Sequence, residues 1–413
     1  MFKRAFLNLI GADSPSSVAL EEERRSHPEP QSYMAAVGAT YLPDEITIRI
    51  LARLPVKTLM TCKSVCKVWY NLINQPALVD MHLHQSTVDS KNNKEQESFL
   101  AINTDTTLRK HVVNLLTQET HSEFIYLNIP YEKYACITLI GCCNGLLCVR
   151  ARKSSDPAAD FYFINPAIRE SKAICSTMKA ADSKGCFGVG YDSVNKDYKL
   201  VRVTGFINNE GKNCSKAEVW TLYGNSWRGA DNTVEGEVRE SSCKAVVNGA
   251  FHWQAVRVNR QENSKTFLIV SFDISNEVFG EMMSPDFGYA PSTRSLSACK
   301  GSLAMFVSYM DANLDSCYDI WLMKEYGVAE SWTNQFTIKP FTIMKPLGFG
   351  NSGELLVALK DGAIGLYDPC TGKTKPFSIQ AGPIAPYMLN YVESLVTVMR
   401  QNGFRGRFEL GAA

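Results

Sequence analysis

Residues 136–166 read CITLIGCCNGLLCVRARKSSDPAADFYFINP. Three short apolar runs, at 136–140, 146–149 and 161–164, are separated by Asn144–Gly145 and by a polar loop, and Asn165–Pro166 follows the last of them. An Asn-Gly pair between apolar runs is a strong signal for a tight β-hairpin, and Asn-Pro favours a turn. The stretch therefore predicts three short antiparallel strands joined by turns.

The same succession of apolar run, turn and apolar run recurs four times downstream, in units that begin near Cys186, Val246, Gly301 and Gly353. A repeat of about 45–60 residues is close to that of a four-stranded propeller blade. Two further pairs of strand-like pieces lie near the chain ends, at 98–102 with 124–127 and at 388–391 with 395–398. Pairing the two ends would make another blade and leave no free sheet edge. We expect an all-β propeller of six blades over 98–400; an open pair of β-sandwiches is the alternative.

Equivalent loops in a repeat fold emerge on the same face. The connections between the second and third strands of the five units are mostly long and polar, and they hold 153–160, 205–216, 256–265, 310–317 and the short 360–362. Long loops gathered on a rigid scaffold favour a binding surface, although surface insertions are also tolerated for no functional reason. The sequence identifies no substrate-binding residue among them.

Residues 42–86 have helical spacing instead. Pro43 suits a first helical position, Ile46 and Ile50 are four residues apart, and Pro55 and Pro76 punctuate the pattern, which predicts three short helices. A segment this short cannot bury all of its apolar side chains internally. We expect the remaining exposed apolar side chains to be buried against a partner. The remaining segments are predicted to be a disordered tail at 1–41, a linker at 87–97 and a second tail at 401–413.

Composition narrows the function further. The 413 residues carry 43 basic and 42 acidic side chains, which argues against binding nucleic acid through bulk charge. No apolar run approaches a membrane span, and the 13 cysteines form no CxxC pair or metal-ligand cluster. The sequence contains no HExxH metalloprotease motif, no GxSxG nucleophile elbow and no P-loop. His252 is expected to be a strand residue packed in the core. We therefore expect a soluble protein of the cytoplasm or nucleus with no cofactor, no metal and no catalytic residue.

The helical segment resembles an F-box, and the strands resemble the F-box-associated, kelch-like region of plant-type F-box proteins, a group that includes self-incompatibility-locus F-box proteins. The F-box likeness rests on 42–45 (LPDE), 50–57 (ILARLPVK), 63–69 (KSVCKVW) and 72–73 (LI). The downstream likeness rests on 141–148 (GCCNGLLC), 165–166 (NP), 188–192 (GVGYD), 197–199 (DYK), 321–327 (WLMKEYG) and 331–332 (SW).

This resemblance implies that the helices dock on a Skp adaptor, which joins them to a cullin and a RING subunit of an SCF ubiquitin ligase, while the propeller holds a protein substrate. The residues that it implies form or support the docking face are Leu42, Pro43, Ile46, Ile50, Leu51, Leu54, Pro55, Leu59, Val65 and Trp69. Direct contact is expected above all from Leu42, Pro43, Leu54 and Pro55, whereas Ile46, Val65 and Val68 are expected to hold the helices together in part.

Catalysis would then consist of positioning a substrate lysine, with no bond chemistry in this chain. The alternative is a propeller that binds a protein or a small ligand as an inhibitor or scaffold outside any ligase. Assembly with a cullin separates the two.

Overall fold

The computed structural model describes residues 43–92, 97–105, 110–117, 122–127, 129, 133–134, 136–153, 159–174, 185–239, 243, 245–259, 261–311, 316–339, 343–380 and 388–399. Leu42 and the two predicted tails, 1–41 and 401–413, lie outside these residues. The chain forms two compact units, Met1–His82 and Leu83–Ala413. None of the described helices is long and apolar enough to cross a membrane.

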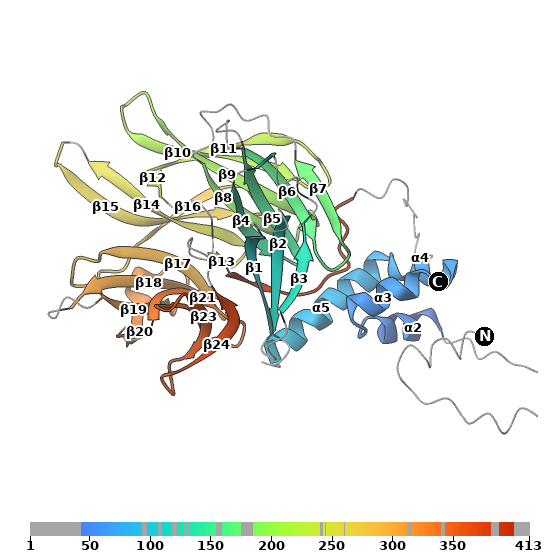
Figure 1. The fold of residues 1–413 in the computed structure, drawn as a ribbon. Helices are drawn as coiled ribbons and strands as arrows, with labels where there is room; N and C mark the ends of the chain where they lie inside the picture. The colour runs from blue at the N-terminus through green and yellow to red at the C-terminus, as the bar shows by residue number, and fades with distance from the viewer. Residues whose placement is uncertain are drawn as a thin grey trace, which may run out of the picture. The chain divides into compact units, whose positions relative to one another are not determined.

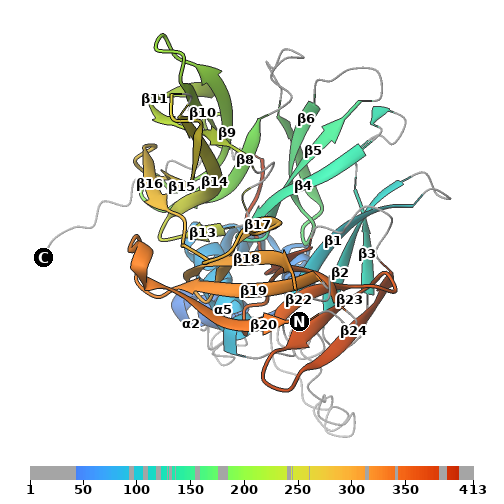
Figure 2. The same ribbon diagram turned by 90° about the vertical axis from the view of Figure 1, so that its left-hand side faces the viewer.

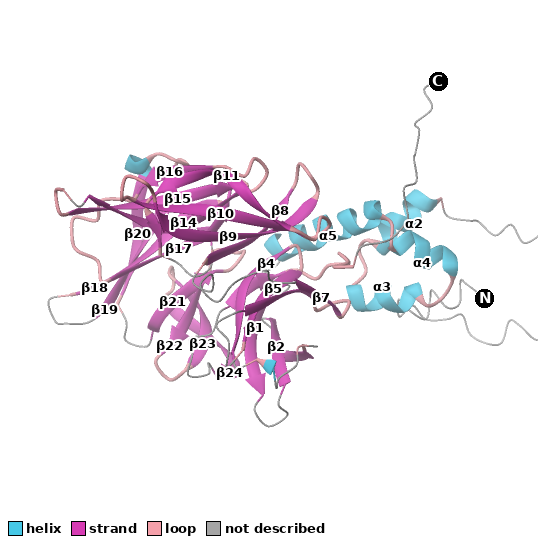
Figure 3. Ribbon diagram, turned by 90° about the horizontal axis from the view of Figure 1, so that it is seen from above, coloured by secondary structure: helices cyan, strands magenta, loops and turns pink. Residues whose placement is uncertain are grey.

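The first unit is helical (Figures 1 and 3). Within the described residues its helices are α2 (Asp44–Leu51), α3 (Val56–Lys63), α4 (Lys67–Ile73) and the start of α5 (Pro76–Asn92). Pro43 and Pro55 directly precede α2 and α3, where a missing N–H is not needed. The core between these helices is apolar and includes Leu51, Val56, Leu59, Cys62, Leu72, Ile73 and Leu78.

The sequence predicts three helices here, and the fourth is a correction. Pro76 opens α5 as its first residue, because proline's fixed φ suits a first helical turn as well as it disrupts an interior one. Residues 87–92 of the predicted linker are therefore the last turns of α5, and 93–96 lie outside the described residues.

The second unit consists almost entirely of strands (Figure 3), and its described strands form six antiparallel sheets arranged around a common centre, as Figure 2 shows. We number these sheets blades 1 to 6. Blade 1 contains β1 (Ser98–Asp105), β2 (Lys110–Thr117), β3 (Ser122–Tyr126) and β25 (Met388–Tyr391); blade 2 contains β4 (Cys136–Cys143), β5 (Leu146–Arg152), β6 (Ala159–Asn165) and β7 (Glu170–Ile174); blade 3 contains β8 (Cys186–Asp192), β9 (Asp197–Ile207), β10 (Asn213–Thr221) and β11 (Trp227–Glu235).

The remaining three blades follow in chain order. Blade 4 contains β12 (Glu237–Val238), β13 (Ala245–Val247), β14 (Ala250–Asn259), β15 (Ser264–Asp273) and β16 (Phe279–Met283); blade 5 contains β17 (Thr293–Cys299), β18 (Ser302–Met310), β19 (Ser316–Met323) and β20 (Trp332–Ile338), with the short 3₁₀ turn η6 (Ala329–Ser331) before its last strand; blade 6 contains β21 (Ile343–Phe349), β22 (Leu355–Leu359), β23 (Ala363–Asp368) and β24 (Lys373–Gln380). The predicted six-bladed propeller is confirmed.

Tight turns join the first two strands of several blades. Asn144 and Gly145 both have positive φ, 51° and 78°, and Asn248 with Gly249 repeats the pattern at 50° and 71°. Two-residue turns of this kind match the right-handed twist of the strands, and asparagine and glycine tolerate the left-handed backbone that the turns need. The turn residues quoted from the sequence are therefore the ones that set the register of these hairpins.

Both ends of the propeller chain complete blade 1, as the sequence predicts. β25 is the first strand of the sheet and pairs antiparallel with β1, with Ser98 opposite Tyr391 and Ala101 opposite Met388. β25 also contacts β4 of blade 2 and β21 of blade 6. This pairing closes the ring and removes the exposed edge that an open array would leave.

Side chains bind both sides of this seam. On the blade 6 side, the Asn390 Nδ2 donates to the Phe349 carbonyl over 3.0 Å and to the Asn351 Oδ1 over 3.1 Å. The buried Glu97, one residue before β1, accepts hydrogen bonds from the Asn351 N–H and the Ser352 hydroxyl. Burial outweighs these bonds and raises the pKa of the Glu97 carboxyl.

On the blade 2 side, the segment after β25 differs from the expectation. Residues 395–398, predicted to be a strand, form no ladder in the structure, yet most are buried. The fully buried Asn165 donates from its Nδ2 to the carbonyls of Ser394 (2.9 Å) and Val396 (2.8 Å). Side-chain hydrogen bonds thus replace the strand partner that this extended segment lacks.

Replacing Asn165 with alanine should weaken the ring closure. The change leaves two buried carbonyls without a donor, each costing about 1–3 kcal/mol, so the free energy of unfolding should fall by about 2–6 kcal/mol. Denaturant unfolding followed by tryptophan fluorescence measures it. Asn276→Ala, at an exposed turn position in blade 4, is the matched control and should change little. Equal stabilities for the two variants would contradict this role of Asn165.

Candidate functional site

The predicted docking residues of the helical unit fall into two structural classes. Leu51 and Leu59 are buried and form part of the core, so they support a docking face without reaching it. The others described are exposed or half-buried: Pro43, Ile46, Ile50, Leu54, Pro55, Val65 and Trp69. Leu42 lies outside the described residues.

Helix α2 shows how the two classes separate. Leu51 is 1% exposed and faces the core, whereas Ile46 is 45% exposed. At 100° per residue, Ile46 lies about 140° around the helix from Leu51, and Ile50, one turn after Ile46, lies next to it. Ile46 and Ile50 therefore form an apolar stripe on the side of α2 away from its buried residue.

Ile46, Val65 and Val68 were expected to hold the helices together in part, and the structure leaves all three exposed. Val68 is four residues before the buried Leu72 on α4, so its spacing placed it on the core stripe, yet half of its surface stays accessible. The sequence analysis also missed Tyr70, which is exposed on α4. Tyr70 lies two residues from Leu72, off the periodic stripe, and that offset is the signal that it faces outward.

The corner between α2 and α3 is fixed from within the unit. The Nε2 of the buried His82, in α5, lies 3.1 Å from the Leu54 carbonyl. Burial lowers the pKa of His82, so the imidazole is neutral near pH 7 and serves as a structural hydrogen-bonding group. This contact holds Leu54 and the exposed Pro55 in place at the end of α2.

The propeller has two chemically different faces. Successive antiparallel strands end on opposite sides, so the connections between second and third strands share one side, here called the loop face, and the connections between first and second strands share the other, the turn face. Of the described residues, the loop face carries 208–212, 261–263, 311 and 360–362, and the turn face carries tight turns such as 144–145 and 248–249.

The loops on the loop face are shorter than predicted because the strands are longer. β9 extends to Ile207, and β14 and β15 reach Asn259 and Ser264, so that much of 205–216 and 256–265 is paired hairpin. Both faces of these hairpin tips are exposed to solvent, so their sequence lacks the alternation of apolar and polar residues that marks a strand. The sequence therefore predicts a loop where the structure has paired strands. Large exposed apolar side chains lie at the strand ends of the loop face, namely Ile207, Phe267, Met283, Met310 and Met344. The turn face also exposes some, including Val194 and Tyr326, so apolar exposure alone does not select a binding face.

Each of the two units matches a known protein family model. Residues 98–398 match the model of the F-box associated beta propeller domain, and residues 39–84 match an F-box-like model. The propeller match covers most of the chain. This chain belongs to the F-box-associated β-propeller family.

Relatives of this F-box protein align with it over most of their length. F-box protein CPR1 of Arabidopsis thaliana is 27% identical over 86% of this chain and 88% of its own length. F-box protein At3g07870 and F-box/kelch-repeat protein At3g23880, both of Arabidopsis thaliana, are 27% and 25% identical, covering 82% and 80% of this chain and 87% and 89% of their own. Among solved structures, the β-propeller domain of the Trilobed protease from Pyrococcus furiosus has a TM-score of 0.36 and 11% identity over 69% of this chain and 80% of that chain. An F-box region joined to a propeller indicates an F-box substrate adaptor.

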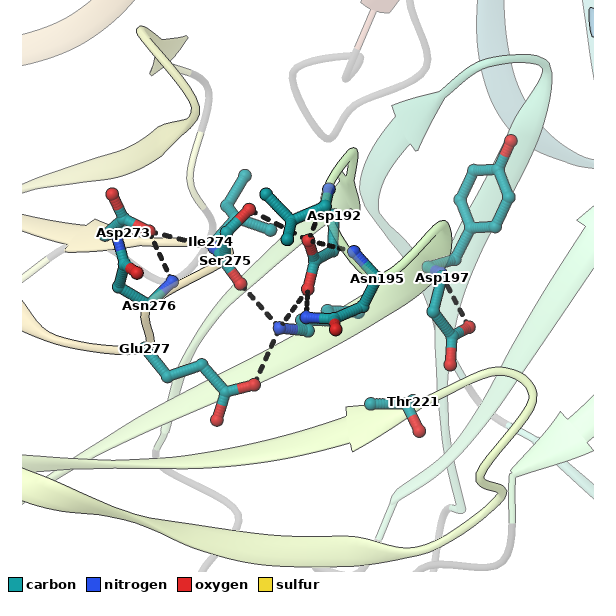
Figure 4. A network of polar contacts seen from close by, with 12 residues as sticks. Asp192, Asn195, Asp197, Thr221, Asp273, Ile274, Ser275, Asn276 and Glu277 are labelled. Carbon is teal, nitrogen blue, oxygen red and sulfur yellow. Dashed lines mark hydrogen bonds and ion pairs between the residues drawn. The ribbon is translucent and has the colours of Figure 1, made fainter.

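Among the residues that the structure describes, an extensive network of buried ionic contacts lies between blades 3 and 4 (Figure 4). The Lys199 Nζ lies 2.6 Å from the Asp192 Oδ2 and 2.7 Å from the Glu277 Oε1, and it donates to the Ile274 carbonyl over 2.6 Å. Arg228 donates to both oxygens of Glu277. Asp192 and Lys199 belong to the β8–β9 hairpin of blade 3, while Ile274 and Glu277 belong to the β15–β16 turn of blade 4.

The pKa shifts of Asp192 and Glu277 indicate that this network of ion pairs joins blade 3 to blade 4. Burial by itself would raise the pKa of Asp192, but bonds from Lys199, Asn195 and Ser275 hold it well below its usual range. The same balance, with Arg228 and Lys199 as partners, lowers the pKa of Glu277. Every charge in the cluster is paired, so both carboxylates remain ionised and poorly suited to exchange protons near pH 7.

His252 is a packed strand residue, as expected. It is fully buried, with its Nδ1 3.1 Å from the Ala245 carbonyl and its Nε2 2.8 Å from the Tyr326 hydroxyl. Burial lowers the pKa of His252 to about 4. Over the described residues, no group of three or more His, Cys, Asp or Glu side chains could hold a metal ion.

Lys199→Met should destabilise the propeller in a pH-dependent way. The variant removes this cation from the buried Asp192 carboxylate and from the partly buried Glu277 carboxylate, a loss of about 3–5 kcal/mol near pH 7. Because both carboxylates have lowered pKa values when folded, the stability that they contribute is present above about pH 4 and is lost as the pH falls further. The gap between wild type and variant should therefore narrow in acid.

Denaturant unfolding at pH 7 and at pH 3.5 measures this effect. Lys196→Met, an exposed lysine in the same hairpin, is the matched control and should match wild type at both pH values. A gap that stays constant between the two pH values would show that Lys199 acts through packing and not through its charge.

Proposed function

We propose that this F-box protein is the substrate-recognition subunit of an SCF-type ubiquitin ligase, acting in the cytoplasm or nucleus. Its helical segment, 42–86, docks on a Skp adaptor, through which a cullin and a RING subunit are recruited. The propeller, 98–400, binds the protein to be ubiquitinated. The chain contributes no catalytic residue; it raises the local concentration of substrate lysines near the charged conjugating enzyme.

The observation that carries this proposal is the apolar surface left over on the F-box helices. Leu51, Leu59 and Leu72 already fill the core, yet Ile46, Val65, Val68 and Tyr70 remain exposed. In so small a helical unit, such side chains are costly to leave in water and serve best in an interface. Each that becomes buried on binding contributes about 1.5–3 kcal/mol before the costs of association.

The exposed residues lie on elements that pack together. α4 contacts both α2 and α3, so the Ile46–Ile50 stripe and the α4 residues belong to one rigid helical unit. The half-buried Leu54 and exposed Pro55 are held by His82 at the α2–α3 corner. These residues, with Pro43 and Trp69, constitute the proposed docking face; Leu51 and Leu59 support it from the core.

Ile46→Asp should separate docking from folding. Ile46 is exposed on the side of α2 opposite the core, so the variant should keep the helical content and unfolding midpoint of wild type. Loss of one buried apolar contact should weaken adaptor binding by about tenfold to a hundredfold. Calorimetry with a purified Skp adaptor measures adaptor binding. Co-purification with the cullin measures assembly of the ligase.

The matched control is Ile207→Asp, the same change at an exposed position of the propeller, which should bind the adaptor like wild type. A folded Ile46→Asp protein that binds normally would place the adaptor elsewhere on the chain. Failure of folded wild type to bind any Skp adaptor would remove the ligase function and favour an inhibitor or scaffold propeller.

A further inference from the structure

Arg294 lies on the loop face, between blades 4 and 5, and no described acidic residue forms an ion pair with it. Arg294 is the second residue of β17, next to the 284–292 connection that emerges on this face. Its guanidinium carbon lies 3.7 Å from the centre of the Phe267 ring and 5.4 Å from that of Phe287. The planar cation is thus in contact with two aromatic rings from separate segments of the chain.

The electrostatics of Arg294 distinguish it from other arginines of the propeller. Arg228 and Arg257 each form an ion pair with a glutamate, Glu277 and Glu281 respectively. Among the residues that the structure describes, Arg294 has no carboxylate within ion-pair distance, and its buried Nε has no hydrogen-bond partner. Burial lowers the pKa of the Arg294 guanidinium, and no acidic group offsets that effect.

The acid on β19, which β18 separates from β17, is already engaged. Asp319 accepts one hydrogen bond from the Tyr289 hydroxyl over 2.7 Å and another, at its other oxygen, from the Thr337 hydroxyl over 2.6 Å. Asp319 therefore holds Tyr289 and Thr337 in place and forms no ion pair with Arg294.

The surroundings of Arg294 are apolar and rigid. Phe287 packs edge-on against Trp321 at 5.4 Å, and Tyr289 packs on Tyr309 at 4.7 Å. Phe267, which shares the blade 5 side of β15 with Ile269, remains 42% exposed. Phe267, Phe287 and Arg294 are here called the Arg294 patch. Exposed apolar groups around a partly buried cation are typical of the energetic centre of a protein interface.

We propose that the Arg294 patch binds an acidic segment of a protein substrate, in which an aspartate or glutamate carboxylate pairs with Arg294 and a neighbouring apolar side chain packs on the exposed Phe267 ring. A guanidinium already stripped of part of its water loses little more on pairing, and its fork geometry matches a carboxylate. This assignment rests on the proposed function only in calling the partner a substrate.

Charge complementarity favours one carboxylate over a polyanion. The exposed Asp286, directly before Phe287 in the sequence, would repel a nucleic acid or an acidic membrane. A single acidic residue beside an apolar one neutralises Arg294 without meeting this repulsion. A phosphorylated residue is the competing source of negative charge, and the experiment includes it.

The test is a selection of random peptides displayed on phage against the full-length chain. Wild type should enrich peptides in which an acidic residue stands beside an aromatic or aliphatic one. Binding of the enriched peptides should fall about tenfold to a hundredfold in Arg294→Gln, and should lose its dependence on salt. Arg294→Lys, which keeps the charge but loses the planar fork, should bind with intermediate affinity. Lys373→Gln, an exposed cation on the turn side of blade 6, is the control and should bind like wild type.

Three further measurements make the outcome decisive. Phe267→Ala, at a half-exposed ring, should also weaken peptide binding while the unfolding midpoint is kept. Enriched peptides without acids, or binding that Arg294→Gln leaves unchanged in a folded protein, would overturn the proposal, as would phosphoserine versions of the peptides that bind more tightly than the acidic ones. All Arg294 variants should bind the Skp adaptor normally, so loss of adaptor docking and loss of peptide recognition are measured separately.

Discussion

The pairing of β1 with β25 is the constraint on which the second unit depends. Every other described sheet is built from strands consecutive in the chain, whereas this pair joins residues 98–101 to 388–391. Each blade packs on its neighbours, so an unpaired β25 would leave blade 1 short of its inner strand and the ring open. Ring closure must bring together the two ends of the propeller chain, which costs conformational entropy. Hydrogen bonds from Asn390 on one side of β25 and from Asn165 on the other offset this cost.

Most of this architecture follows from local sequence. Turn residues such as Asn144–Gly145 specify hairpins without reference to the rest of the chain, and their recurrence gives the six blades and the closing role of both ends. Misassigned features are those where local chemistry is ambiguous. Pro76 both ends and begins helices, residues 395–398 are apolar and buried but find side-chain partners instead of a strand, and the tips of β9 and β14 are paired although polar. Only tertiary contacts decide between the options in these cases.

The candidate sites show a sharper limit of sequence reasoning. Ile46 and Leu51 are equally apolar, and only the direction of α2 within the helical unit makes one a surface residue and the other a core residue. Family resemblance selects both, because a docking face and the core beneath it are constrained together. The Arg294 patch gives no sequence signal at all, since Phe267, Phe287 and Arg294 belong to separate elements that meet where blade 4 packs on blade 5.

Two cationic sites of the propeller illustrate how burial distinguishes structure from function. Lys199 is almost completely buried and is matched by two carboxylates and a carbonyl, so its desolvation is compensated within the fold and its role is to join blades. Arg294 is also partly desolvated, but the described residues around it supply aromatic rings and no ion-paired acid. A cation–π contact compensates the lost hydration of a cation less than an ion pair does. The Arg294 guanidinium therefore contributes little to joining the blades. It suits recognition of a partner, because a carboxylate of that partner supplies the ion pair that the propeller lacks at this position.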